Sequence, residues 1–227
     1  MDEPEGDPYS GEQELNSPKT YLHVSPYPGQ HVRLYADTDE KSQLQALRRR
    51  HDDLAASPGR TRRVEFEYRR GGTLAYLAAL DVHHATVMGR CAPTTGIVPF
   101  GELVEQVMTQ EPYASARRVF WIVDNGSSHA GQASVQRMRQ AWPKAVLVHL
   151  PIHASWLNQI EIYFSIVQRK VVKPANFADL SALEERLLAF QNRYNATASP
   201  FHWRYTKTDL NDYLQRLATH DPLGPAA

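Results

Sequence analysis

The hydrophobic pattern changes its period near residue 97, and this change constrains the fold more than any other feature of the chain. Apolar runs typical of strands come first, at residues 31–37, 63–69, 74–82 and 86–91. Helical periods then alternate with buried-strand runs, in the order 98–112, 117–125, 127–143, 145–152 and 155–172. Strands separated by helices favour right-handed parallel crossovers. We therefore expect an α/β fold in which an antiparallel meander and parallel strands form one mixed sheet flanked by helices.

The length of the chain favours one domain between two less ordered ends. With 227 residues, 42% of them hydrophobic, the chain can bury a core of ordinary size. We expect this domain over residues 31–220, with one of its helices opening at a capping box formed by Ser181 and Glu184. Residues 1–30 are acidic and rich in Pro and Gly, which predicts a disordered tail, and residues 221–227 are expected to form a flexible C-terminus.

Charge and cysteine content narrow the class of protein. Lys plus Arg and Asp plus Glu both number 25, so overall charge does not decide for or against a polyanionic partner. Residues 48–70 nevertheless hold eight arginines against four acids, which suits local contacts to phosphates. The single Cys91 excludes an intramolecular disulfide and favours a reducing compartment. No signal peptide and no apolar run of about 18 residues is present, so we expect a cytoplasmic protein without a membrane span.

Three acids lie where the predicted topology brings strand ends together. Asp39 is expected to follow the first strand, Asp124 ends the WIVD strand, and Glu161 lies two turns into the helix after the last strand. Neighbouring parallel strands end in a common crevice, so these carboxylates are expected to converge. Each acid alone is more typical of a turn or a helix cap. Together they form an all-oxygen donor set, which favours a pair of Mg²⁺ or Mn²⁺ ions suited to phosphodiester chemistry.

Five sequence blocks carry a resemblance to a known family. They are DEKSQLQAL at 39–47, EYRRGGT at 67–73, ALDV at 79–82, VDNGSSH at 123–129 and ASWLNQIEIYF at 154–164. In this order they resemble the catalytic core of mariner-related bacterial insertion-sequence transposases of the DDE superfamily. The resemblance implies a ribonuclease H-like domain in which Asp39, Asp124 and Glu161 bind two divalent ions, cleave DNA at transposon ends and join the freed 3′-hydroxyl to target DNA.

Residues beside the three acids have weaker predicted roles. Asn158 lies one helical turn before Glu161 and is expected either to support the site or to face solvent. His129 is expected either to contact the scissile phosphate or orient Asp124, or to be an ordinary exposed residue. Asp37 is expected to be solvated or to support the site indirectly, and Trp156 to lie in the core. Candidate phosphate contacts, each equally typical of a solvated surface, are Lys41, Arg62, Arg63, Arg69 and Arg70.

The stretch before the resemblance leaves the function open. Relatives usually carry helix-turn-helix units ahead of the core, and residues 1–30 show no recognition helix. We therefore consider a nucleoid-associated transposase catalytic domain that acts on transposon ends and target DNA, either as a homodimer or with a separate helix-turn-helix protein. One alternative is a truncated, non-catalytic derivative that binds DNA or a partner and inhibits it. Another is a ribonuclease H-like nuclease that cleaves without strand transfer.

Overall fold

A computed structural model describes most of the chain between residues 33 and 201. The described residues are 33–63, 65–151, 157–173, 176–201, 208–209, 211–212 and 215–216. Gln30–Pro200 forms the first of two compact units. The expected tail over 1–30 and the expected flexible C-terminus over 221–227 lie outside the described residues, so the following concerns the first unit alone.

One five-stranded sheet forms the centre of this unit, in the order β3-β2-β1-β4-β5. Its strands are β1 (Arg33–Arg49), β2 (Tyr68–Asp81), β3 (Thr86–Ala92), β4 (Arg118–Val123) and β5 (Ala145–His149). β2 pairs antiparallel with both β1 and β3, whereas β4 pairs parallel with both β1 and β5. The expected mixed sheet, a meander joined to parallel strands, is confirmed.

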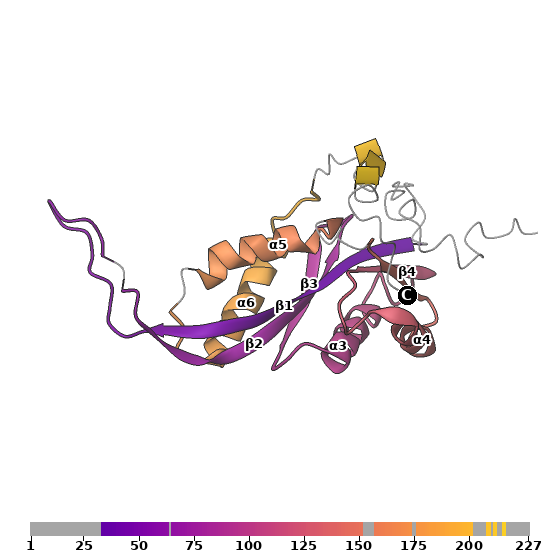
Figure 1. Ribbon diagram of the computed structural model, residues 1–227, viewed down its shortest axis with the longest axis horizontal. Helices are drawn as coiled ribbons and strands as arrows, with labels where there is room; N and C mark the ends of the chain where they lie inside the picture. The colour runs from indigo at the N-terminus through magenta and orange to yellow at the C-terminus, as the bar shows by residue number, and fades with distance from the viewer. Residues whose placement is uncertain are drawn as a thin grey trace, which may run out of the picture. The chain divides into compact units, whose positions relative to one another are not determined.

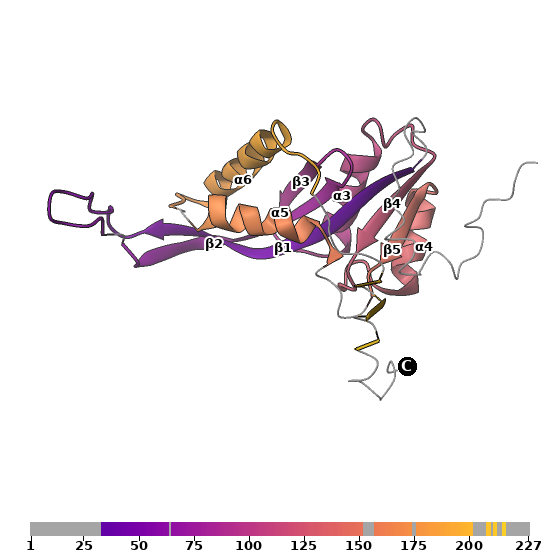
Figure 2. The same ribbon diagram turned by 90° about the horizontal axis from the view of Figure 1, so that it is seen from above.

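Helices cover both faces of the sheet (Figure 1). They are α3 (Ile97–Met108), α4 (Gly131–Ala141), α5 (Ile160–Val167), which a π-helical turn, η2 (Gln168–Val172), extends, and α6 (Leu180–Asn195). Figures 1 and 2 show α3 and α4 on one face and α5 and α6 on the other. The apolar residues expected to line the helix after the last strand are buried, namely Leu157, Ile160, Phe164, Val167 and Val171.

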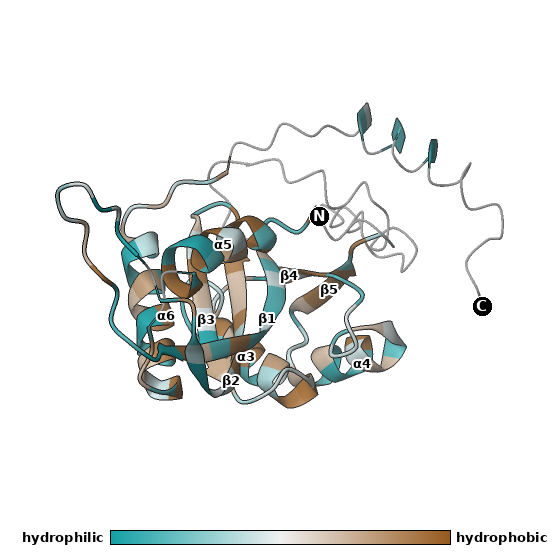
Figure 3. Ribbon diagram, turned by 60° about the vertical axis from the view of Figure 1, so that its left-hand side comes forward, coloured by the Kyte–Doolittle hydropathy of each residue, from teal (hydrophilic) through white to brown (hydrophobic). Residues whose placement is uncertain are grey.

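Burial on both faces explains the apolar second half of β2. Its residues from Leu74 to Asp81 are all buried, and successive side chains point to opposite faces. Leu77 joins the core that includes residues of α3 and α4, and Tyr76 packs edge-on against Phe164 of α5. The hydropathy colouring in Figure 3 shows this apolar layer between the helices. Among the described residues, no helix is long and apolar enough to span a membrane.

The first strand is much longer than expected, and this corrects the predicted position of Asp39. The apolar run ends near residue 37, but β1 continues to Arg49, so Asp39 lies within the strand and does not follow it. β1 extends past its apolar run because it pairs with β2, and main-chain hydrogen bonds between strands need no apolar side chains. Two register shifts, between Lys41 and Leu44 and between Gln45 and Leu47, accommodate the polar DEKSQLQ stretch.

Two further predictions need correction. The expected strand over 63–69 is not a separate strand: residues 65–67 carry no regular structure, and Tyr68 already begins β2. Leu54 and Arg63 form only an isolated bridge in the intervening loop. The capping box at Ser181 is also wrong, because Asp179 is the N-cap of α6 and its Oδ1 accepts a hydrogen bond from the Ala182 amide at 2.8 Å.

Candidate active site

The parallel pairing of β1 with β4 brings Asp39 and Asp124 to the same end of the sheet. Asp37 of β1 is in register with Ile122 of β4, and each acid lies two residues further along its own strand direction. The parallel pairing ends here, at the carboxyl end of β4, where open α/β sheets place their sites, whereas β1 continues to Arg49. Both aspartates are partly buried.

Glu161 reaches this end of the sheet because the chain just before α5 is bonded to β1. The Gln159 amide donates to Asp37 Oδ2 at 2.9 Å, and Asn158 Nδ2 donates to the Thr38 carbonyl oxygen at 3.0 Å. Glu161 follows in the first turn of α5. Asp37 is fully buried, so it is not the solvated group considered above; it supports the site by holding the start of α5.

Burial and acidic neighbours raise the pKa of Asp39. Burial raises the pKa of Asp39 to about 8; a hydrogen bond with the Glu161 side chain and the charges of Asp124 and Glu161 add to this rise. The Glu40 amide, which donates to Asp39 Oδ1 at 2.7 Å, opposes it. A carboxyl group with such neighbours holds its proton until a cation or a proton donor compensates the crowded negative charge.

His129 is buried and holds Asp124 at two points. Its Nε2 lies 3.3 Å from Asp124 Oδ1, and its Nδ1 lies 3.0 Å from the Asp124 carbonyl oxygen. Burial lowers the pKa of His129 and the charge of His149 adds to this, whereas the Asp124 carboxylate opposes it. His149 also donates to the His129 carbonyl oxygen at 2.7 Å. The residue is therefore not an ordinary exposed histidine, and its contacts are those of a group that orients Asp124.

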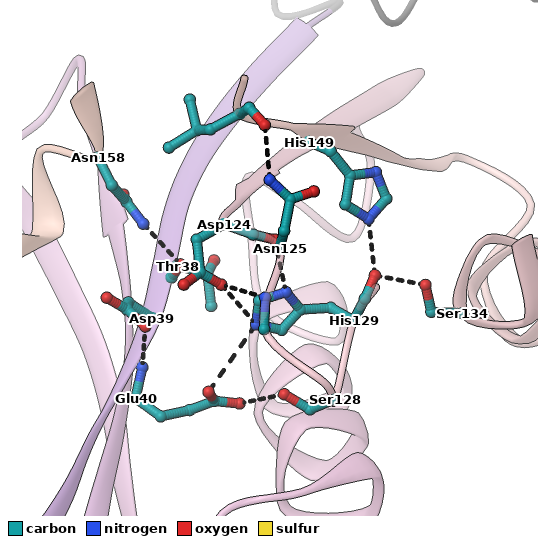
Figure 4. A network of polar contacts seen from close by, with 12 residues as sticks. Thr38, Asp39, Glu40, Asp124, Asn125, Ser128, His129, Ser134, His149 and Asn158 are labelled. Carbon is teal, nitrogen blue, oxygen red and sulfur yellow. Dashed lines mark hydrogen bonds and ion pairs between the residues drawn. The ribbon is translucent and has the colours of Figure 1, made fainter. Parts of the chain in front are cut away.

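Glu40 belongs to the site although the sequence analysis did not select it. Its Oε1 accepts a hydrogen bond from Ser128 Oγ at 2.8 Å, and its Oε2 lies 3.8 Å from His129 Nε2 (Figure 4). Burial raises the pKa of Glu40; the Ser128 hydrogen bond opposes this rise and the charge of Asp124 adds to it. Strand alternation gave no signal for this residue, because it places Glu40 on the opposite face of β1 to Asp39. Asp39 and Glu40 thus serve two sides of the same strand.

Asn158 supplies an observation on what the site can bind. The residue is 1% exposed, and its Oδ1 accepts no hydrogen bond from any residue that the structure describes. A buried amide oxygen without a donor is costly, and it is a hard ligand for a cation or an acceptor for bound water. Together with the carboxylates of Asp39, Asp124 and Glu161, it makes an all-oxygen set whose chemistry fits Mg²⁺ or Mn²⁺. Within the described ranges, no three His, Cys, Asp or Glu side chains are already arranged around a metal position.

The predicted basic residues lie along β1, β2 and the loop between them. Lys41 is two residues after Asp39 on β1, and Arg69 and Arg70 begin β2. Arg62 is in the loop and makes an ion pair of 2.5 Å with Asp53. Arg63 is in the same loop with an exposed side chain. None of the four arginines is close in sequence to Asp39, Asp124 or Glu161. Trp156, which was expected in the core, lies outside the described residues.

Solved structures with a similar fold include several complexes of Mos1, a mariner transposase. The chain matches the Mos1 paired-end complex with Mn at a TM-score of 0.53 and 14% identity, covering 92% of this chain and 63% of that chain. The paired-end complex with the left transposon end matches at 0.54 and 14%, with coverage of 92% and 62%. The Mos1 strand transfer complex matches at 0.53 and 13%, with coverage of 83% and 54%. These likenesses show a ribonuclease H-like fold, and the chain spans less than two thirds of the length of each Mos1 chain.

A family model gives the more specific relationship. No curated protein matches the chain. The model described as DDE superfamily endonuclease matches residues 34–184, which is more than half of the chain and includes all three predicted acids. The resemblance inferred from the five sequence blocks is therefore confirmed at the level of the superfamily. The chain belongs to the DDE superfamily of endonucleases.

Proposed function

We propose that this domain cleaves DNA at the ends of a transposable element and joins the freed 3′-hydroxyl to target DNA, using two Mg²⁺ or Mn²⁺ ions. The observation that carries the proposal is the meeting of Asp39 of β1, Asp124 just after β4 and Glu161 of α5; burial first, and then these acidic neighbours, raise the pKa of Asp39 to about 8. Membership of the DDE superfamily supports the same reaction class. The mariner-like fold supports transposition in particular.

Each part of the proposed site has a chemical role. Asp39, Asp124 and Glu161 would hold the ions, and the chemistry that such ions would supply is activation of a hydroxyl nucleophile and stabilisation of the leaving oxygen. Asn158 would add its buried Oδ1 as a ligand or as an acceptor for ordered water. His129 keeps the Asp124 carboxylate oriented from two sides. Preorganised carboxylates reduce the reorganisation needed when a phosphodiester binds, so these contacts contribute to the rate.

DNA is the proposed partner, both as transposon end and as target. The Mos1 structures that share this fold are paired-end and strand transfer complexes, which supports a reaction on paired ends. Two protein copies, or a separate helix-turn-helix protein that recognises the ends, would meet this need. The cytoplasmic, nucleoid-associated location belongs to the same proposal.

A nicking assay on supercoiled DNA tests the proposed cleavage. The parent chain, Asp124→Asn and Glu161→Gln would be compared in Mn²⁺, in Mg²⁺ and in EDTA, with folding checked by circular dichroism. We expect nicking by the parent only, and only with metal. Nicking by either folded variant at the parental rate would overturn the metal-site assignment.

Strand transfer requires its own assay, because a nuclease of the same fold would also nick. A labelled duplex with a free 3′-hydroxyl at a transposon end would be incubated with plasmid and Mn²⁺. Joined products that need Asp39 support the transposase. Cleavage without any joined product, with several end sequences, would instead support the nuclease considered above.

A further inference from the structure

The outer parts of β1 and β2 form a two-stranded ribbon that extends beyond α5 and α6 (Figures 1 and 2). We call the segment from Leu47 to Arg50, with its partners from Glu67 to Arg70, the outer ribbon. Within it, Arg48 is the register partner of Arg69, and Leu47 is the partner of Arg70. Arg48, Arg69 and Arg70 are all exposed, so the ribbon presents guanidinium groups to solvent.

The pairing of Arg48 with Arg69 is electrostatically unfavourable. Directly opposite residues of an antiparallel pair project from the same face with their Cβ atoms about 5 Å apart, and like charges in such positions destabilise the sheet. Neither arginine has an ion-pair partner among the described residues, so the repulsion is not relieved within that part of the chain. A bound anion would relieve it.

The neighbouring position of the ribbon shows the alternative arrangement. Two residues further along the same face, Arg50 pairs with Glu67 at 3.3 Å, and the Arg50 amide donates to the Glu67 carbonyl oxygen at 3.1 Å. Opposite charges therefore meet at one position of the ribbon, whereas two positive charges meet at the next. This contrast within one face separates Arg48 and Arg69 from the arginines that are neutralised by protein acids.

Exposed aromatic rings belong to the same part of the chain but not to the same face of the ribbon. Phe66, just before β2, is 82% exposed, and Tyr68, at its start, is 47% exposed. Tyr68 is the register partner of Arg49, so it projects from the opposite face to Arg48 and Arg69, and the charge of these two arginines carries the argument. A two-stranded ribbon is also narrow enough to follow the backbone or enter the major groove of a duplex.

We propose that the outer ribbon binds the phosphate backbone of duplex DNA, with Arg48 and Arg69 as its central pair. This inference deepens the proposed function, on which it rests, by assigning DNA contact to a surface separate from the metal-binding acids. Binding there would be independent of sequence, since phosphates carry no base identity. It would hold the duplex on the domain without contributing to the bond-breaking chemistry.

The proposal predicts that substituting either arginine weakens DNA binding and at the same time stabilises the fold. The full chain would be titrated onto a fluorescent duplex in EDTA, where no cleavage occurs, at several salt concentrations. We expect Arg48→Gln and Arg69→Gln each to weaken binding about three- to tenfold and to reduce the salt slope by about 1. Both variants should melt at a higher temperature than the parent because the like-charge repulsion is gone. Arg69→Glu should give the largest loss of binding and the largest gain in stability.

Arg50→Gln is the matched control, because it removes the same charge from the same face of the ribbon. It should bind DNA almost as the parent does and melt at a lower temperature, since Glu67 loses its partner. Equal binding losses for Arg48→Gln and Arg50→Gln would show a general charge effect and overturn the proposal. So would unchanged binding in both Arg48→Gln and Arg69→Gln.

Two outcomes separate this proposal from its alternatives. If Arg48→Gln abolishes self-association in analytical ultracentrifugation while DNA affinity is unchanged, the ribbon joins copies of the chain and the proposal fails. If the parent nicks DNA with Mn²⁺ but the ribbon variants bind DNA normally, the ribbon inference fails and the proposed function stands. Binding that depends on the ribbon in a chain that never nicks would refute the proposed function alone.

Discussion

Glu40 Oε1 accepts a hydrogen bond from Ser128 Oγ at 2.8 Å, which joins β1 to the loop that follows β4. Asp39 precedes Glu40 on β1, and Asp124 begins that loop, so this one hydrogen bond joins the strand of one predicted aspartate to the loop of the other. Ser128 is buried, as is His129, whose ring contacts the Asp124 carboxylate. Removing a group that orients a metal ligand commonly lowers metal affinity or activity 10- to 100-fold.

The first prediction follows from this link. Ser128→Ala should lower the Mn²⁺-dependent nicking rate by roughly tenfold and raise the Mn²⁺ concentration needed for half-maximal rate. Ser127→Ala is the control, since Ser127 is exposed one residue away. If both variants nick at the same rate with the same Mn²⁺ requirement, the Glu40–Ser128 bond does not support the site.

A second prediction uses Gly126. A Cβ at this position would lie 2.9 Å from Asp124 Oδ1 and 3.1 Å from His129 Nε2. The Asp124 side chain can move away from the new Cβ at little cost in folding free energy. Its carboxylate then leaves the position that the site requires. Gly126→Ala should therefore reduce nicking at least tenfold while changing the melting temperature by only a few degrees.

Gly101→Ala is the matched control for Gly126→Ala. Gly101 lies in α3, and a Cβ there meets no atom within 4 Å. Alanine in an exposed helical position should stabilise the protein by about 0.5–1 kcal/mol and leave nicking unchanged. A Gly126→Ala variant with full activity would contradict the placement of Asp124 and His129 in one tight cluster.

The third prediction concerns the pH dependence of stability without metal. The pKa of Asp39 is raised to about 8, well above the usual range of an aspartate, so the folded protein holds a proton that the unfolded chain releases. Stability should therefore fall as pH rises from about 4 to about 8. Asp39→Asn removes this loss, so in EDTA it should melt above the parent at pH 8, with a smaller gap at pH 5. Thermal denaturation at the two pH values measures the difference.

Asp53 is the control of opposite sign for Asp39. A hydrogen bond from Arg62, then one from the Glu65 amide, lowers the pKa of Asp53, so its contribution is present at neutral pH and lost as pH falls through that lowered value. Asp53→Asn should leave the protein no more stable than the parent at pH 8. An Asp39→Asn variant that behaves in the same way would contradict the crowding of carboxylates around Asp39.

The fourth prediction tests a buried contact outside the site. Tyr113 donates its hydroxyl to Asp81 Oδ2 at 2.5 Å, and Asp81 is 1% exposed. Tyr113→Phe leaves that carboxylate with one donor fewer, which should cost about 1–3 kcal/mol of unfolding free energy in a urea titration. Tyr68→Phe, at an exposed position of β2, should cost less than about 0.5 kcal/mol. Equal stability of the two variants would show that the Tyr113 hydrogen bond contributes nothing.

Local patterns were sufficient for the order of the main elements of the sheet and its helices. Alternating and helical periods correctly predicted the meander, the parallel strands and the helices between them, because burial on one or both faces shows directly in sequence. These patterns failed where strand pairing or a side-chain hydrogen bond decided where an element begins or ends. The polar stretch after Asp39 continues β1 because β2 bonds to it, and Asp179 caps α6 because its side chain reaches the Ala182 amide.

Residue types and periodicity alone predicted an all-oxygen set of candidate ligands and an α/β sheet expected to bring Asp39 and Asp124 together. The contact of Glu40 with Ser128, the burial of His129 against Asp124 and the pairing of Arg48 with Arg69 became visible only in the folded chain. Periodicity is a local property of a few neighbouring residues. Register, bulges and buried polar contacts depend on which distant segments pair, and one shifted residue would turn each of these side chains to the other face.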